Sequence, residues 1–548
     1  MKKLFVIALC FVMVMGIFAA CNGNTTPTAG GEATNGNNGD QITLSIGLPV
    51  NVKVEDYETN AYTRWLEETT GYNLEFVTFT SNSTDYKSQL STRLNDLPDI
   101  LWNFDLSASA VRSYGEDGYF IDLTEYYEDE EFSGEFWERV AQLPEDLQDE
   151  IKRDLVDKET EEMYSVLRVE YSLVDRIDYQ VYINQSWLDQ LSLEMPTDPD
   201  SLYNVLKAFK ENDLNGNGDK TDEIPLLGYE NGYGGDVINW IVNMFIYAND
   251  QRWWNVDENG KLYSPFRTDE YREALKFIDK LIDEGLLYDT TFAGNQEDMQ
   301  PMLNPADGVS KVGIWTAHPT SVLVLGNEAA YDYEALPQWG CAVMKDYVIK
   351  TSSFITDQCE HPDEAFKLLM TMCSEEGSLR MRYGEKGVDW TDADEGTKSF
   401  LGYDAKIKVL NESAFNANGN QTWGANAATI LIYAENEETQ LMTAEEDTWT
   451  AHKMKIMGEC VVDYNKAAEE NNPELVQPLV YTLTESEATN AERTNCQNWI
   501  KQCRSQFCTG KMDVHSDDQW QGYLNELDAQ GYETWLQQAQ QLYDAQQG

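Results

Sequence analysis

Oxygen-bearing side chains are concentrated in one short stretch of this chain. Residues 212–226 read NDLNGNGDKTDEIPL, with Asp and Asn alternating with glycine until an apolar run begins at Ile224. Calcium binds six to eight oxygen atoms, and alternate positions of a tight loop can turn such atoms towards one centre. Gly218 stands at the sixth position counted from Asp213, where a sharp bend is needed. The stretch indicates either a calcium loop or an Asx-rich turn without a metal.

Residues that point to catalysis are few. The four histidines, His318, His361, His452 and His515, are far apart, and none lies in an H-E-x-x-H motif. The sequence contains no G-x-S-x-G elbow and no glycine-rich phosphate loop. Because there are 96 acidic residues, a carboxylate pair at glycosidase spacing carries no information from sequence alone. We predict that the protein is not an enzyme, with a cell-surface glycosidase as the remote alternative.

The charge balance excludes one class of partner. The 548 residues include 39 basic and 96 acidic ones, a formal net charge of −57. Such a surface repels phosphate backbones, so we predict no nucleic-acid partner. With 42% hydrophobic residues the chain can bury a large core. Its length suggests about two to four lobes.

The N-terminus has the pattern of a secretory signal peptide. Residues 1–21 read MKKLFVIALCFVMVMGIFAAC, an apolar run framed by two lysines and by two alanines before Cys21. Small residues directly before a cysteine resemble a bacterial lipobox, which implies cleavage before Cys21 and lipidation of its sulfur. The alternatives are an ordinary signal peptide with a chance cysteine, or an uncleaved membrane anchor.

A flexible tether is predicted to follow. Residues 22–40 are rich in Gly, Asn and Thr and contain no apolar residue larger than alanine. No later stretch is long and apolar enough to span a bilayer. We therefore expect residues 1–20 as signal peptide, 21–40 as lipidated cysteine and tether, and a body held at the extracellular face of the cytoplasmic membrane.

Seven of the nine cysteines lie beyond Cys10 and Cys21. An odd number cannot be fully paired within one chain, and the absence of a C-x-x-C motif argues against structural zinc. We expect mostly free thiols, with one disulfide among the last three, Cys496, Cys503 and Cys508, left open.

The elements predicted for the first part of the body alternate between strands and helices. Strands are expected over residues 41–50 and 72–80 and near 99–104, with helices near 60–71 and 83–95 between them. This order is typical of βαβ units and an α/β fold with a mostly parallel sheet. In such sheets ligands lie beyond the carboxyl ends of the strands, which makes Trp102 and Asp105 candidates for a binding pocket.

A second α/β stretch begins near residue 179 and contains the oxygen-rich loop. The helix predicted over 269–286 places Leu275, Ile278 and Leu281 on one face and stops at Gly285. A strand is predicted near 310–316, a helix with Pro362 in its first turn, and two closing helices broken at Gly531.

Five segments together resemble the extracellular solute-binding proteins of family 1, lipoproteins that capture cargo for ABC importers. The segments span 182–197, 205–226, 271–287, 360–390 and 520–546. The resemblance implies a two-lobed periplasmic-binding-protein-like fold of type II with the ligand between the lobes. It implies lobe 1 from 41–178 plus about 330–372, and lobe 2 from 179–329 plus about 373–548.

The chain is most similar to the calcium-bearing branch that includes alginate-oligosaccharide binders, where the oxygen-rich loop holds a structural calcium ion. Compared with that branch, one extra residue stands between Gly218 and Asp222, and the twelfth position of the loop is Ile224 rather than an acid. The ligands implied here are Asp213, Asn215, Asn217, Asp222 and Glu223, with Asp219 contributing its backbone or side chain.

The resemblance also implies residues that contact an oligosaccharide. A sugar has apolar faces and a rim of hydroxyls, so it is held by flat aromatic rings together with charged or amide groups. Maltose-binding relatives place an aromatic residue and a carboxylate where Trp102 and Asp105 stand, and further rings where Trp315 and Trp423 stand. The other predicted contacts are Trp240, Trp253 and Trp254, beside a glycine-rich stretch, and Tyr182, for which plain packing is the alternative.

The function implied by the resemblance is capture of an oligosaccharide by lobe closure and its delivery to the permease subunits of an ABC importer. The alternative is a peptide or another small solute as the cargo. An acidic sugar would call for arginines in the cleft, and Arg168, Arg176 and Arg252 form no obvious cluster in the sequence. We favour a neutral or mildly substituted oligosaccharide.

Overall fold

The computed structural model describes residues 41–547 apart from 171–172, 231–234, 325–326, 346–347, 412–413, 415–418, 424–439, 442–448, 480, 482–484 and 486–487. The predicted signal peptide, Cys21 and the tether lie outside the described residues. No described helix is both long and apolar enough to cross a membrane. All seven described cysteines are free thiols.

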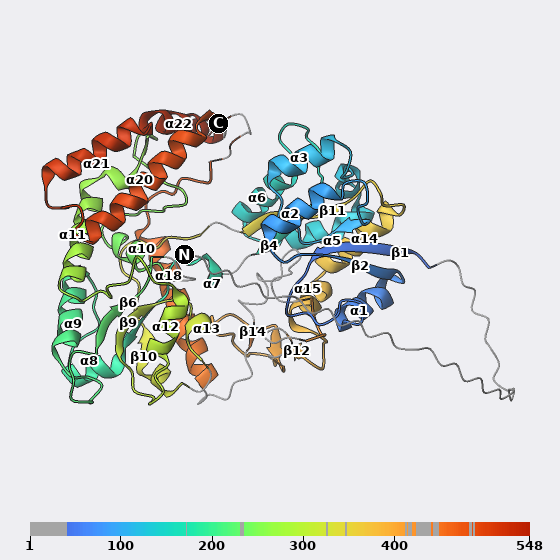
Figure 1. Ribbon diagram of the computed structural model, residues 1–548. Coiled ribbons are helices and arrows are strands. Elements are labelled where there is room, and N and C mark those ends of the chain that lie inside the picture. The colour runs from blue at the N-terminus through green and yellow to red at the C-terminus, as the bar shows by residue number, and fades with distance from the viewer. Residues whose placement is uncertain are drawn as a thin grey trace, which may run out of the picture. The chain divides into compact units, whose positions relative to one another are not determined.

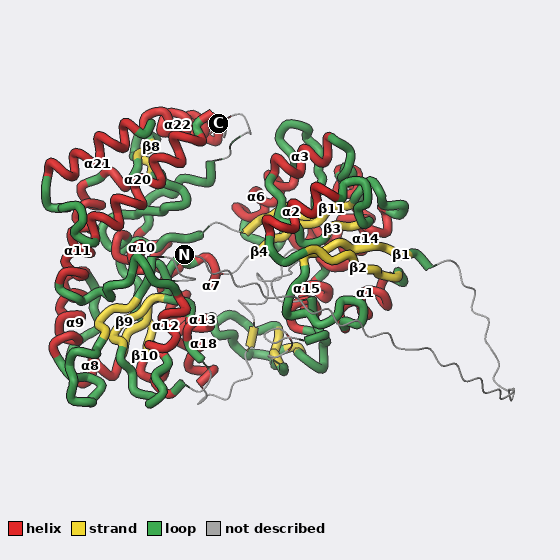
Figure 2. The backbone as a smooth tube through the Cα atoms, in the orientation of Figure 1, coloured by secondary structure: helices red, strands yellow, loops and turns green. Residues whose placement is uncertain are grey.

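The first sheet has five strands in the order β2-β1-β3-β11-β4 (Figures 1 and 2). β1 pairs in parallel with β2 and β3, whereas β11 pairs antiparallel with β3 and β4. The expected βαβ order is thus present in the parallel part of the sheet, but the prediction of a mostly parallel sheet is wrong, because β11 joins both of its neighbours antiparallel. The strands are β1 (Thr43–Pro49), β2 (Asn73–Phe79), β3 (Ile100–Leu101), β4 (Val166–Glu170) and β11 (Val348–Ile355).

Helices around this sheet begin and end at local signals. α1 starts after Asn60, whose side chain accepts from the Tyr62 amide, and stops at Gly71, where φ is 77°. The helices are α1 (Ala61–Thr70), α2 (Ser83–Thr92), α3 (Ala108–Glu116), α4 (Thr124–Glu128), α5 (Glu130–Val140), α6 (Glu145–Leu155), α14 (Pro362–Cys373) and α15 (Glu375–Tyr383). A small sheet of β12 (Trp390–Asp392), β13 (Ile407–Val409) and β14 (Gln440–Leu441) follows.

The second sheet has four strands in the order β10-β5-β9-β6. β6 is parallel to β9, and β5 is antiparallel to both β9 and β10. The strands are β5 (Val181–Asn184), β6 (Ile224–Leu227), β9 (Val312–Thr316) and β10 (Tyr333–Ala335). A two-stranded ribbon pairs β7 (Asn255–Val256) with β8 (Leu262–Tyr263).

Helices around the second sheet include those predicted. α11 buries Tyr271, Ala274, Leu275, Ile278 and Leu281, the helical spacing that the sequence indicates. The helices are α7 (Leu173–Arg176), α8 (Gln185–Leu191), α9 (Pro199–Glu211), α10 (Val237–Val242), η1 (Pro265–Arg267), α11 (Asp269–Asp283), α12 (Gln296–Leu303), α13 (Pro319–Val322), η2 (Glu328–Asp332), α18 (Trp449–Asn471), α20 (Asn490–Cys508), α21 (Asp517–Ala529) and α22 (Tyr532–Gln547).

Each sheet has its own hydrophobic core, and we call the parts around the five-stranded and four-stranded sheets lobe 1 and lobe 2. Core membership corrects the expected boundaries. Tyr333 and Ala335 pair with β5 and belong to lobe 2, so the return to lobe 1, predicted at about residue 330, comes later in the chain. Cys373 and Met381 join the core of lobe 1, although 373–548 was expected in lobe 2. Strand pairing and core packing, which local sequence patterns do not encode, set these boundaries.

Candidate functional site

Asp105 lies just beyond the carboxyl end of β3, as its position in the sequence indicates. The chain leaves the strand through Asn103, whose φ of 62° lies in the left-handed region that asparagine tolerates. The Asp105 amide then donates to the Tyr86 hydroxyl over 3.2 Å. The Asp105 carboxylate is half exposed and lies 2.7 Å from Lys350 Nζ on β11. The strand end therefore carries an accessible ion pair.

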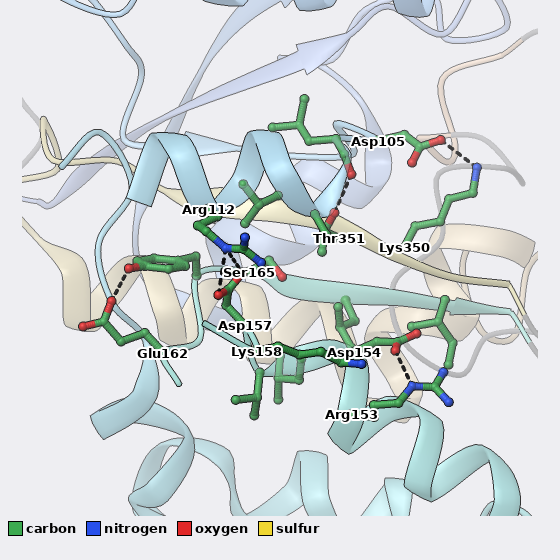
Figure 3. A pocket seen from close by; sticks show the side chains of 18 of the residues that line it. Asp105, Arg112, Arg153, Asp154, Asp157, Lys158, Glu162, Ser165, Lys350 and Thr351 are labelled. Atoms are coloured by element: carbon green, nitrogen blue, oxygen red, sulfur yellow. Dashed lines mark hydrogen bonds and ion pairs between the residues drawn. The ribbon is translucent and has the colours of Figure 1, made fainter. Parts of the chain in front are cut away.

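A cavity of about 330 Å³ lies beside this ion pair and is lined by residues of α3, α6, β4 and β11 (Figure 3). Its walls combine apolar side chains such as Val111, Leu155 and Leu167 with eight charged ones. The acids and bases are equal in number, although the whole chain has a net charge of −57. The charged lining residues are Asp105, Asp154, Asp157, Glu162, Arg112, Arg153, Lys158 and Lys350.

Arg112 holds one wall of this cavity in place. Its Nε lies 2.9 Å from Asp157 Oδ2 and its Nη1 lies 2.7 Å from Glu159 Oε1. Burial favours the neutral acid, but donation from the Glu159 and Thr160 amides and from Arg112 holds the pKa of Asp157 below its ordinary value. The wall thus consists of charges that are already paired and oriented.

Two more groups of the cavity have shifted pKa values. Burial, followed by the nearby charge of Arg153, lowers the pKa of Lys158. Burial and a hydrogen bond to Glu162 raise the pKa of Tyr164 to about 12, so its hydroxyl stays protonated and donates to that carboxylate. The lining therefore offers both hydrogen-bond donors and acceptors among apolar side chains.

Lobe 2 contains a second charged cluster. Two of its acids, Glu230 and Asp236, come shortly after β6 in the sequence. Arg504 on α20 donates from Nε to Glu230 Oε1 over 2.9 Å and lies 3.7 Å from Asp250. Asp178 accepts from Asn239 Nδ2 over 2.5 Å and lies 3.7 Å from Lys345 Nζ. We call Asp178, Glu230, Asp236, Asp250 and Arg504 the Arg504 cluster.

Carboxylates outnumber cations in the Arg504 cluster. The Arg504 side chain is only 4% exposed; burial lowers its pKa, but its acidic neighbours, Glu230 and Asp236 first, together outweigh burial and raise the pKa. Burial raises the pKa of Asp236 well above its ordinary value, with Arg504 opposing the shift, and burial also raises the pKa of Asp178. The cluster is therefore a largely buried network in which Arg504, Lys345 and Lys501 compensate the carboxylates.

Trp253 connects this cluster to a second cavity. Its φ of 68° lies in the left-handed region, which bulky side chains rarely adopt. Lys501 Nζ lies 5.6 Å from the centre of its ring and 3.6 Å from Asp250. Trp253 also lines a cavity of about 290 Å³ together with Arg252, Trp254 and Tyr481.

The aromatic rings predicted to contact a sugar in lobe 1 are core residues in this structure. Trp423 is fully buried, and its ring meets that of Trp102 edge to face at 5.0 Å. Its indole Nε1 donates to Thr63 Oγ1 over 2.8 Å. A stacking platform needs an exposed face, and neither ring presents one. The gain from burying such large rings explains why they join the core.

The predicted rings of lobe 2 are covered in the same way. Trp315 and Tyr182 are fully buried and stack on each other at 4.4 Å. Trp240 is 2% exposed, and Trp253 and Trp254 are 5% and 3% exposed. Trp254 packs on Trp535 at 4.6 Å. Of the predicted contact residues, Asp105 alone is substantially exposed, and Trp253 and Trp254 line a cavity.

Sequence reasoning missed the partners of these sites. Lys350 is separated from Asp105 by 245 residues and Arg504 from Glu230 by 274 residues. One available signal was the position of Glu230 three residues beyond the end of β6, which parallels that of Asp105 four residues beyond the end of β3. The basic partners carry no comparable local signal.

The oxygen-rich loop bends through two left-handed glycines, Gly216 with φ of 73° and Gly218 with φ of 88°. Asp213 accepts from the amides of both glycines over 2.8 Å. The side-chain amides of Asn215 and Asn217 each donate to Asp222 over 2.9 Å. The predicted residues therefore converge on one another within a closed hydrogen-bonded turn.

Asp219 has a different role in this turn. Its carboxylate accepts from the Thr221 amide over 3.0 Å and from the Thr221 hydroxyl, while its amide donates to Asn217 Oδ1. Its side chain thus faces Thr221 rather than Asp222.

The buried carboxylate of Glu223 bears on whether the loop fits calcium. Glu223 is 7% exposed; its Oε1 accepts from the Leu214 amide over 2.9 Å, whereas its buried Oε2 has no hydrogen-bond partner. A buried carboxylate oxygen without a donor is costly unless a cation faces it. Within the described part of the chain, no group of three or more His, Cys, Asp or Glu is arranged as a metal site. The loop instead mixes carboxylate and amide oxygens, and this set fits calcium.

Comparison with known proteins identifies relatives for part of the chain. No protein-family model matches it. Lipoprotein LipO of Bacillus subtilis is 30% identical over 261 residues, which are 47% of each protein. The fructooligosaccharide ABC transporter substrate-binding protein FusA of Streptococcus pneumoniae is 28% identical over 227 residues, 40% of each protein. The matched region thus spans about half the length, or less, of these relatives.

Solved structures match almost the whole chain. FusA in complex with kestose covers 92% of this chain and 99% of its own, with a TM-score of 0.66 and 20% identity. A FusA mutant altered in its EF-hand, in complex with fructo-nystose, matches with a TM-score of 0.66 and 19% identity. An extracellular solute-binding protein from Bifidobacterium longum subsp. infantis covers 92% of this chain with a TM-score of 0.70 and 19% identity. The two-lobed fold of these solute-binding proteins is therefore the fold of this chain.

Proposed function

We propose that this protein is the solute receptor of an ABC importer and captures an oligosaccharide between its two lobes. The observation that carries the proposal is the match of 92% of the chain to FusA, a substrate-binding protein solved with kestose. Closure of the lobes around the sugar would present one defined surface to the permease. The protein would bind and release the sugar without changing it.

The charged groups at the strand ends support this assignment. In lobe 1, Asp105 and Lys350 provide an acceptor and a donor beside a cavity of about 330 Å³. In lobe 2, the cavity at Trp253 is lined by polar side chains that include Gln251, Arg252 and Gln497. Pre-oriented donors and acceptors of both kinds are what sugar hydroxyls need, since little ordering entropy is then lost on binding.

We also propose that the oxygen-rich loop binds a structural calcium ion and that Cys21 carries a lipid anchor. When bound, calcium would neutralise the carboxylates of the loop and so stabilise its fold. The residues that would hold it are Asp213, Asn215, Asn217, Asp222 and Glu223. Lipidation of Cys21 would hold the protein at the extracellular face of the membrane, in keeping with its similarity to a protein named as a lipoprotein.

The test is a thermal-shift screen of the purified protein, with calcium present, against fructooligosaccharides, acidic oligosaccharides and short peptides. A ligand that binds the native state adds about 2.7 kcal/mol of stability at one hundred times Kd. We expect a shift with one sugar class and recovery of that sugar uncut. A shift with peptides alone would overturn the oligosaccharide assignment, and cleaved sugar would indicate a glycosidase.

A further inference from the structure

Lys311 lies directly beside the oxygen-rich loop, at the point where the loop enters the sheet. Its carbonyl accepts from the Ile224 amide over 2.9 Å, and β6 and β9 then pair from Ile224 and Val312 onward. This pairing fixes the backbone of Lys311 next to the end of the loop. From there Lys311 Nζ reaches Asp222 Oδ2 at 2.9 Å.

Asp222 is consequently the most heavily hydrogen-bonded carboxylate of the loop. It accepts from Lys311 Nζ and from the side-chain amides of Asn215 and Asn217, each over 2.9 Å. These donors, Lys311 first, lower the pKa of Asp222 despite some burial. An oxygen that is to coordinate calcium must give up such donors or share them.

The charge of Lys311 acts on more than Asp222. Asp222, Asp307 and Glu223 all raise the pKa of Lys311, with Asp222 contributing most. Its ammonium group lies 2.9 Å from Asp222, and the carboxylates of Asp307 and Glu223 are near enough to add to the attraction. One of these, Glu223, carries the buried Oε2 that has no donor of its own. Lys311 thus supplies positive charge where the loop would otherwise hold uncompensated acids.

We propose that Lys311 is an internal counter-ion of the loop, which holds Asp222 while the metal is absent and thereby lowers the affinity of the loop for calcium. The inference rests on the proposed calcium loop and adds a residue that sets its affinity. A calcium ion has to displace the ammonium group from Asp222, or bind against its charge if the lysine stays. In either arrangement the positive charge of Lys311 weakens the binding of the divalent cation. When calcium is scarce, the same charge compensates the loop acids and keeps the loop folded.

The test compares calcium binding by calorimetry, after chelation, in the wild-type protein and in Lys311→Met. Removing one positive charge near a divalent ion is expected to tighten calcium binding about tenfold. Lys311→Arg keeps the charge and is expected to retain the wild-type affinity. Lys455→Met is the matched control, because Lys455 is also ion-paired in lobe 2, to Glu334 at 3.0 Å, but pairs away from the loop.

Melting temperature supplies the second measurement. In a chelator, Lys311→Met is expected to melt below the wild type because its loop acids lose their counter-ion, and saturating calcium is expected to remove that difference. An unchanged calcium affinity in Lys311→Met would overturn the role of Lys311. If neither protein binds calcium, the calcium loop itself is overturned, while the oligosaccharide assignment is judged separately by the thermal-shift screen.

Discussion

The two lobes carry charged clusters that differ in burial. In lobe 1 the cavity wall is made of paired charges near the surface, with the Lys350 side chain 40% exposed and that of Arg112 13% exposed. In lobe 2, Arg504 is 4% exposed and is surrounded by several carboxylates. We therefore expect the buried Arg504 cluster to contribute more to the stability of its lobe than the charged pairs of lobe 1 do. The more exposed pair of lobe 1, Asp105 and Lys350, is accessible to a ligand.

Arg504→Met gives the largest effect expected from this comparison. It leaves Glu230, whose side chain is 17% exposed, without its cation, and loss of one partner of a largely buried pair costs about 3–5 kcal/mol. Urea unfolding is expected to show this loss. Lys501→Met is the control, because its side chain is 50% exposed and its contact with Asp250 is longer, at 3.6 Å. Equal losses of unfolding free energy in Arg504→Met and Lys501→Met would show that burial does not set the contribution of these charges.

Arg112→Met tests the intermediate case. Asp157 and Glu159 lose their shared cation, and charge-assisted hydrogen bonds of this kind contribute about 1.5–3 kcal/mol. The free energy of unfolding is expected to fall by that amount, less than for Arg504→Met. Arg153→Met serves as the control, because Arg153 lines the same cavity and its side chain is more exposed, at 30%. A loss larger than that of Arg504→Met would reverse the ranking by burial.

Asp236→Asn tests the pH dependence of the lobe 2 cluster. Because burial raises its pKa, native Asp236 keeps its proton over a range in which the unfolded chain has lost it. The native state then binds more protons, so stability falls as pH rises from about 3.9 towards the raised pKa. Asn removes this fall, and its side-chain oxygen can still accept from the Asn239 amide.

Urea midpoints between about pH 4 and pH 7 measure this effect. The wild type is expected to lose more stability across that range than Asp236→Asn does. Parallel curves for the two proteins would show that Asp236 titrates at its ordinary pKa, and the two lobes would then differ less than the structure indicates.

Lys350→Met gives the smallest expected change in stability and the sharpest test of function. The pair with Asp105 is half exposed, so its loss is expected to cost about 0–1 kcal/mol. If this pair contacts the sugar, affinity falls while the unfolding midpoint stays nearly constant. A variant with normal affinity for the identified sugar would remove Asp105 and Lys350 from the proposed binding surface.

The positions of most elements could be predicted from the sequence, since they depend on neighbouring residues. The Gly71 stop, the first-turn Pro362 and the break at Gly531 all mark real helix boundaries. The order of β1, β2 and β3 and the location of Asp105 at a strand end also follow from local patterns. The convergence of the side chains in the oxygen-rich loop could also be predicted from the sequence, because these residues lie within eleven positions of one another.

Tertiary structure alone decided which side chains are exposed and which distant charges meet. Trp102, Trp315 and Trp423 have the residue type of a sugar platform, yet packing covers both faces of each ring. Lys350 reaches Asp105, and Arg504 reaches Glu230, only because strands and helices remote in sequence pack together. Helix caps and turns depend on interactions over a few residues, whereas burial and ion pairing depend on the whole packed core. The sequence therefore determined the elements and the oxygen-rich loop, and the fold determined the site.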